Sequence, residues 1–512
     1  MLKFKKLTLC VAAICMMALI FASCSGITAP TTGTTADNTQ STTASTNATS
    51  AVNKPEEKPV KLTWYFYLDA LMPDQQLVND KLNEYLLEKI NATVEMNTMK
   101  LSDYETKMPV IISSGQNFDI CYAKAFNAAV SYQNEAATGS LYELTPELLQ
   151  TYAPESLEVI PSRLWDMAKY NGKIYGFPMQ KEEGQQIGYM VNADMAKEYG
   201  LDYSNVKSWK DIEPLLEALH QKAPDIIGLY PTQVWFAASY AIEIGDIGLL
   251  KMPGDTTFFP SQQEGKVFNQ YATPEFKEFC EIMHSWYEKG YLPDNPLTYK
   301  NRSADDKAGK LFAWKTAYSP NYENTYSTTV GHTEDYIPLT PVRYKGTSNF
   351  QVISAASKNP TRAIQFLNLC QSDITVGNLL RHGIEGTHYT KVGNQVHVEG
   401  NAYYYNFGWQ FGCVFNQNWV DDYPENIAEV YREYNAACED NPLAGFAFNN
   451  NNVKNQAAAI NSVLAQYVNP LTMGVMDPDE SIPEFLDALE KNGINELLAE
   501  EQRQVDEYLA NR

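Results

Sequence analysis

The chain has 512 residues, of which 62 are acidic and 39 are basic, so its net charge is −23, and 12% of its residues are aromatic. A chain this acidic lacks the basic stripe that follows a phosphate backbone, which argues against nucleic-acid binding. About 450 residues follow the polar N-terminal segment, and this length suits two domains.

The N-terminus has the pattern of an export signal. Three lysines stand among the first six residues, and residues 7–22 form an uncharged apolar run of sixteen residues. A membrane-spanning helix needs roughly 20 apolar residues, so this run is typical of a secretory signal peptide. It leads into FASC at 21–24, which resembles a bacterial lipobox, although Phe21 stands where leucine is usual. We therefore predict a lipoprotein signal peptide at 1–23 and a lipid on Cys24; the alternative is an ordinary signal peptide with an incidental cysteine.

The segment behind Cys24 is rich in threonine, serine and alanine and has almost no large apolar side chain. Such a composition cannot bury enough surface to offset the entropy of ordering. We predict a lipidated cysteine and a disordered tether at 24–58, which would let the fold stand clear of the membrane. A low-complexity stretch without a role is equally compatible with this composition.

The next residues alternate between strand and helix patterns. Residues 60–68, 92–99 and 118–123 are rich in strand-forming side chains, whereas 74–90 and 102–114 carry apolar residues at helical spacing. The order β-α-β-α-β predicts a parallel sheet with right-handed crossovers. Ligands of such sheets bind beyond the carboxyl ends of the strands.

Further elements follow towards the C-terminus. We predict helices at 211–222 and from Pro274 to Gly290, and a strand at 351–355. The sequence SIPE at 481–484 has the pattern of a capping box, and two terminal helices are predicted behind it, separated at Gly493.

Several segments resemble family 1 extracellular solute-binding proteins: GSLYELTPELLQTYAP (139–154), NGKIYGFPMQKE (171–182), GYMVNADMAKEYGLD (188–202) and SKNPTRAIQFLNLC (357–370). Three others are similar to LipO-type lipoproteins with a C-terminal domain of unassigned function: RHGIEGTHYTKVG (381–393), GFAFN (445–449) and NGINELLAEEQRQVDEYL (492–509). The resemblance runs from about Lys61 to the C-terminus.

The resemblance implies an α/β fold of two lobes that close like a clamshell by a hinge motion, each lobe a mixed sheet flanked by helices. Lobe 1 would hold residues 59–182 and about 349–387, lobe 2 would hold 183–348 and about 388–475, and 476–512 would form C-terminal helices. The chain would cross between the lobes near 180–184 and 342–350, where Gly184 and Gly346 suit a hinge.

The resemblance also implies a function. The protein would be a monomeric, lipid-anchored subunit on the extracytoplasmic face of the cell membrane, delivering a small solute to the permease of an ABC importer. Sugars are the ligands most often met in this family. Aromatic rings stack on sugar rings, and carboxylates accept hydrogen bonds from hydroxyl groups.

We expect most of the aromatic residues to belong to the core, as Trp64 and Trp286 do by their positions in a strand and a helix stripe. Better ligand-binding candidates are aromatic and acidic residues at strand ends or in loops: Tyr67, Asp69, Tyr122, Glu182, Glu183, Trp235, Trp314, Glu385 and Trp409. A core position is the alternative for each tryptophan, and a solvated loop charge is the alternative for Glu182 and Glu183.

Two other classes of function stay open, a surface glycan-processing enzyme and a peptide-binding or adhesion lipoprotein. A pair of neighbouring carboxylates would not by itself indicate a glycosidase, because 62 acidic residues would supply such a pair in any fold. The sequence has no GxSxG, HExxH or phosphate-binding loop, the cysteines form no CxxC, and the spacing of His382 and His388 fits no metal motif. We therefore expect no catalytic residue, cofactor or metal site.

Overall fold

The computed structural model describes residues 58–68, 72–125, 129–231, 265–347, 349–405, 408–439, 443, 446 and 448–510. The predicted signal peptide and Cys24 lie outside these residues, and so does the predicted tether except for Lys58. None of the helices in the described part of the chain is long and apolar enough to cross a membrane.

The first sheet begins with the predicted β-α-β-α-β order. Strands β1 (Val60–Leu68), β2 (Ala92–Lys100) and β3 (Ile120–Lys124) are parallel, with β1 in the middle. Helices α1 (Gln75–Ile90) and α2 (Leu101–Ser113) connect them. The predicted order and the predicted parallel direction are both confirmed. The sequence could predict them because each strand and helix pattern extends over enough residues to be recognised.

Two strands from later in the chain complete this sheet. Strand β13 (Asn349–Ile353) pairs antiparallel with β3, and β6 (Gly176–Pro178) pairs antiparallel with β13, giving the order β2-β1-β3-β13-β6. The sheet is therefore mixed. Alternate residues of β1 face its core, where Trp64 packs edge-on against Phe366 and Phe411 and donates from Nε1 to Gln351 Oε1 at 2.9 Å.

A second, separate sheet has the order β11-β8-β10-β9. Strand β8 (Ile187–Asn192) pairs antiparallel with both β10 (Leu311–Ala317) and β11 (Glu334–Pro338), whereas β9 (Ile227–Tyr230) runs parallel to β10. Its own hydrophobic core includes residues of three helices: α7 (Ala193–Tyr199), α8 (Glu213–Lys222) and α10 (Pro274–Glu288). The predicted α/β class with mixed sheets flanked by helices is confirmed.

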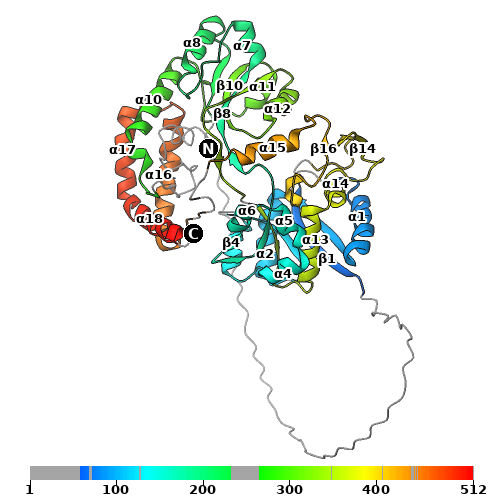
Figure 1. Cartoon of the computed structure of the whole chain (residues 1–512). Coiled ribbons are helices and arrows are strands. Elements are labelled where there is room, and N and C mark those ends of the chain that lie inside the picture. Colours follow the sequence, from blue (N-terminus) through cyan, green and yellow to red (C-terminus); the bar gives the residue numbers. More distant parts are fainter. Residues whose placement is uncertain are drawn as a thin grey trace, which may run out of the picture. The chain divides into compact units, whose positions relative to one another are not determined.

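The C-terminal helices α16 (Lys454–Thr472), α17 (Pro478–Lys491) and α18 (Ile494–Ala510), orange to red in Figure 1, belong to this second core. Helices α16 and α17 contact α10, and α18 contacts α16 and α17. The predicted break at Gly493 is confirmed. The predicted start of α17 at 481 is wrong, because the side chain of Asp477 accepts from the Asp479 amide and begins the helix earlier.

Three segments that lie far apart in the sequence pair with one another. Strand β7 (Gly184–Gln185) pairs with β12 (Arg343–Tyr344), and Arg343 forms a bridge with Glu439. A Cβ on Gly184 would lie 2.4 Å from Val342, so the pairing needs glycine, and Gly346 adopts a φ of 66°. The segments where we predict the crossings, near 180–184 and 342–350, thus include paired backbone. The lobe boundaries stay a prediction, although Tyr405 and Phe411, which we assigned to lobe 2, pack in the first core.

The remaining elements complete the part of the chain that the structure describes. The helices are α3 (Tyr132–Ala137), α4 (Pro146–Tyr152), α5 (Pro154–Val159), α6 (Ser162–Met167), α11 (Arg302–Lys307), α12 (Tyr322–Val330), α13 (Pro360–Ser372), α14 (Ile374–His382) and α15 (Ile427–Ala436). The strands are β4 (Lys169–Tyr170), β5 (Lys173–Ile174), β14 (Tyr389–Val392), β15 (Gln395–Val398) and β16 (Trp419–Val420). Within the described residues, 3₁₀ turns cover Gln270–Ala272, Gly408–Phe411 and Asn450–Val453.

Candidate functional site

Three of the predicted ligand-binding aromatics meet near the carboxyl ends of β1 and β3. The rings of Tyr67 and Tyr122 cross edge-on with centroids 5.3 Å apart, and the ring of Trp409 lies 6.5 Å from that of Tyr122. Parallel pairing of β1 with β3 brings the two tyrosines together, and the 3₁₀ turn Gly408–Phe411 supplies the tryptophan. We call Tyr67, Tyr122 and Trp409 the aromatic cluster.

Hydrogen bonds hold the aromatic cluster in position. The hydroxyl of Tyr122 donates to Asn349 Oδ1 at 2.5 Å, and the hydroxyl of Tyr405 donates to the carbonyl of Tyr67 at 2.7 Å. Tyr122 is buried, and burial raises its pKa well above the usual value, so its hydroxyl stays protonated. Tyr67 and Trp409 are half-buried. The cluster is a fixed aromatic surface with polar edges.

Charged side chains border this surface. The ammonium of Lys181 lies 4.8 Å from the ring centroid of Trp409 and 2.9 Å from Glu182 Oε1, and Lys345 approaches the same oxygen at 3.5 Å. Burial alone would raise the pKa of Glu182, but the two ammonium groups outweigh it and hold that pKa below its usual value. Glu182 is therefore an ionised acceptor close to the aromatic cluster.

Glu183 belongs to a neighbouring network at the crossing segments. Its Oε2 lies 2.6 Å from Arg163 Nε, and its amide donates to Asn435 Oδ1 at 2.8 Å. Burial raises the pKa of Glu183, and the ion pair with Arg163 opposes that rise. Glu183, Arg163 and Asn435 line a pocket of about 560 Å³ together with Gln180 and Arg432. The network joins α6 and α15 to the segment that enters β7.

The other candidates lie elsewhere. Trp314 is 6% exposed in β10 and packs with Tyr326 and Arg302 in a small core of its own. Glu385 is exposed, pairs with Lys391 at 2.8 Å and lines a separate pocket of about 550 Å³. Asp69 and Trp235 lie outside the described residues.

Sequence reasoning missed the cations and the amide that organise this region. Lys181 directly precedes the predicted candidates Glu182 and Glu183 in the sequence. Its place next to them was therefore a signal that could have identified it. Arg163, Lys345 and Asn435 come from three distant segments and carried no local signal.

Known proteins match nearly the whole folded part of the chain. Residues 82–375 match the family described as bacterial extracellular solute-binding protein, and residues 442–510 match a domain of unknown function. A carbohydrate ABC transporter substrate-binding protein from Streptococcus pneumoniae serotype 4 is 30% identical over 460 residues, covering 86% of this chain and 89% of its own. The chain belongs to the bacterial extracellular solute-binding proteins.

Solved structures of solute-binding proteins share the fold. The N-glycan transport solute binding protein NgtS from Streptococcus pneumoniae superposes with a TM-score of 0.74 at 27% identity, covering 89% of this chain and all (100%) of its own. NgtS in complex with Man1GlcNAc gives a TM-score of 0.67 at 26% identity, covering 88% of this chain and 100% of its own. The predicted two-lobed fold and the predicted membership of a solute-binding family, whose proteins act outside the cytoplasm, are confirmed.

Proposed function

We propose that this protein captures a carbohydrate outside the cell and delivers it to an ABC importer without turning it over. The observation that carries the proposal is the similarity to a carbohydrate substrate-binding protein over 460 residues, which is 86% of this chain and 89% of that protein. The importer's permease would be the partner, and a lipid on Cys24 would hold the protein at the membrane.

The aromatic cluster suits this function. A half-buried indole bordered by an ammonium and a carboxylate offers a sugar both a flat apolar surface and hydrogen-bonding groups. Trp409 supplies the ring, Lys181 supplies donors and Glu182 supplies acceptor oxygens. Tyr67 and Tyr122 would extend the contact surface. We place the ligand beside these five residues.

Titration calorimetry with Man1GlcNAc and Man5GlcNAc, the ligands named in NgtS structures, tests the proposal. We expect saturable binding of at least one oligosaccharide by the purified chain, and unchanged ligand when the mixture is analysed by chromatography afterwards. Peptides and uronates serve as comparison ligands. Cleavage of a bound glycan would support the enzyme alternative, and binding of peptides alone would support the peptide-binding alternative.

A second prediction concerns the membrane anchor. Replacing Cys24 with alanine removes the thiol that would carry the lipid, so we expect the variant to leave the membrane fraction or to keep its signal peptide. Cell fractionation followed by mass measurement of the protein distinguishes these states. Replacing Cys10, within the apolar run, is the matched control and should change neither. Normal processing and membrane retention of the Cys24 variant would contradict the lipid anchor.

A further inference from the structure

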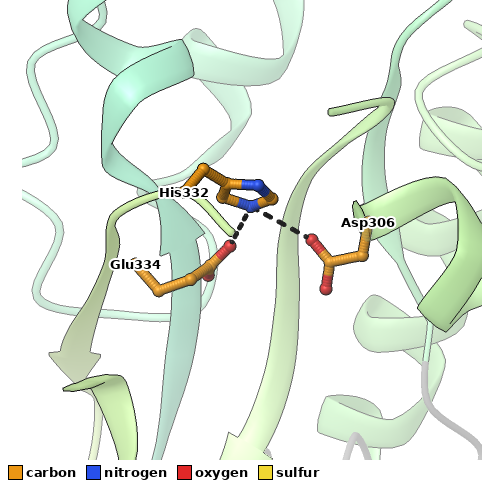
Figure 2. A group of neighbouring side chains, drawn as sticks. All are labelled: Asp306, His332 and Glu334. Atoms are coloured by element: carbon orange, nitrogen blue, oxygen red, sulfur yellow. Dashed lines mark hydrogen bonds and ion pairs between the residues drawn. The ribbon is translucent and has the colours of Figure 1, made fainter. Parts of the chain in front are cut away.

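Three side chains converge in the second sheet region, apart from the aromatic cluster. Asp306 lies on α11, His332 lies between α12 and β11, and Glu334 is the first residue of β11. Figure 2 shows the histidine between the two carboxylates, with both contacts made by one ring nitrogen. His332 Nε2 lies 2.8 Å from Glu334 Oε1 and 3.5 Å from Asp306 Oδ1.

This group is buried and carries more negative than positive charge. Asp306 is 1% exposed and Glu334 is 3% exposed. Among the described residues, Glu334 Oε2 has no hydrogen-bond partner although it is buried. The guanidinium of Arg302 lies 3.6 Å from Asp306 and balances the charge of that carboxylate. In the part of the chain that the structure describes, the Glu334 carboxylate has only His332 as an ion-pair partner, and a histidine is not permanently charged.

We propose that Asp306, His332 and Glu334 bind a divalent transition-metal ion, with zinc as the preferred ion. Each residue offers one ligand atom, and these atoms lie within 4.8 Å of one another. Zinc bonds of about 2.1 Å in tetrahedral geometry place neighbouring ligand atoms about 3.4 Å apart, so small side-chain movements suffice. Imidazole nitrogen favours zinc over calcium or magnesium, which take oxygen ligands.

The surroundings of the group have the features of a metal site. The hydroxyl of Tyr326 donates to Asp306 Oδ2 at 2.5 Å and also accepts from Arg302 at 2.7 Å, so the orientation of this carboxylate is set from behind. Outer contacts of this kind orient metal ligands. Water or an unpaired Glu334 oxygen can supply a fourth ligand, and the side chain of His332, 14% exposed, gives the ion a path from solvent.

An ion here would tie α11 to the start of β11. The guanidinium of Arg302 lies over the ring of Trp314 at 4.0 Å, so the same unit also supports the small core of β10. The ion would therefore stabilise the second sheet region, and it would do so without contact to the aromatic cluster. This role is independent of the carbohydrate that the protein binds.

Metal binding by the purified chain tests the proposal. After treatment with a chelator and its removal, we expect calorimetry to show one tight zinc site per chain, and we expect Tm to rise with zinc concentration because the ion binds the folded state. Cobalt(II) should give the absorption bands of a low-coordinate site with a nitrogen ligand. Calcium and magnesium should neither bind tightly nor displace zinc.

The variants Asp306→Asn and Glu334→Gln keep side-chain size and should each weaken zinc binding by at least about tenfold. His332→Asn, on the most accessible ligand, provides a third variant whose folding is least at risk. His397→Gln is the matched control, because His397 also pairs with a carboxylate, Asp421, at 2.9 Å, but lies exposed. Zinc affinity that persists in the first three variants, that falls in His397→Gln, or that is absent from the unaltered chain would overturn the proposal.

Discussion

Replacing Phe485 with alanine is expected to lower the free energy of unfolding by about 3–5 kcal/mol, the usual cost of emptying a phenylalanine site in a core. Phe485 lies on α17 and is fully buried. Its ring stacks on Tyr467 of α16 at 5.2 Å and meets Tyr271 edge-on at 5.0 Å. The cavity would therefore open where the C-terminal helices join the rest of the second core.

Urea unfolding followed by circular dichroism measures this effect. Leu157→Ala is the control, because Leu157 is 39% exposed on α5 and should cost less than about 1 kcal/mol. An equally small effect at Phe485 would mean that the C-terminal helices are not part of the second core. A large effect would give the domain of unknown function at 442–510 a structural role, since its buried face completes that core.

Replacing Trp409 with alanine is expected to weaken carbohydrate binding by at least about tenfold, or 1.4 kcal/mol, if its ring stacks on a sugar. The reason is its position: the half-buried indole lies beside Tyr122 and under the ammonium of Lys181. Calorimetry with the bound oligosaccharide and thermal unfolding are measured on the same samples. Trp409→Phe keeps an aromatic surface and should recover part of the affinity.

Trp314 is the matched control for this prediction. It is a second tryptophan of the predicted set, but it is 6% exposed and packed against Arg302 and Tyr326. Trp314→Ala should therefore cost about 3–5 kcal/mol of folding free energy. Unchanged sugar affinity in Trp409→Ala would refute stacking at this position, while the family assignment would stand.

Many elements of this protein could be predicted from the sequence, because their signals are local. The β-α-β-α-β order of the first sheet follows from alternating apolar residues in β1 and helical spacing in α1. The crossing placed at 180–184, which stays a prediction, rests on a family resemblance in adjacent residues. Each of these features is decided by residues within a few turns or one strand of each other.

The candidate sites depend on contacts between distant residues, which no local pattern encodes. Tyr67 and Tyr122 were predicted as ligand-binding candidates because they stand at the ends of parallel strands. Their contact with each other, and the approach of Trp409 and Lys181, required the packed fold. Trp314 and Trp409 look alike in sequence, and only packing leaves one half-buried and covers the other.

The Asp306, His332 and Glu334 group illustrates the same limit. Its histidine and glutamate are two residues apart, which fits no metal motif, and its aspartate comes from another helix. Local residue preferences and periodicity therefore determined the elements of this protein, and segments that resemble known proteins indicated its family. Burial, charge pairing and side-chain neighbours were decided by the tertiary structure, because each depends on which surfaces the folded chain brings together.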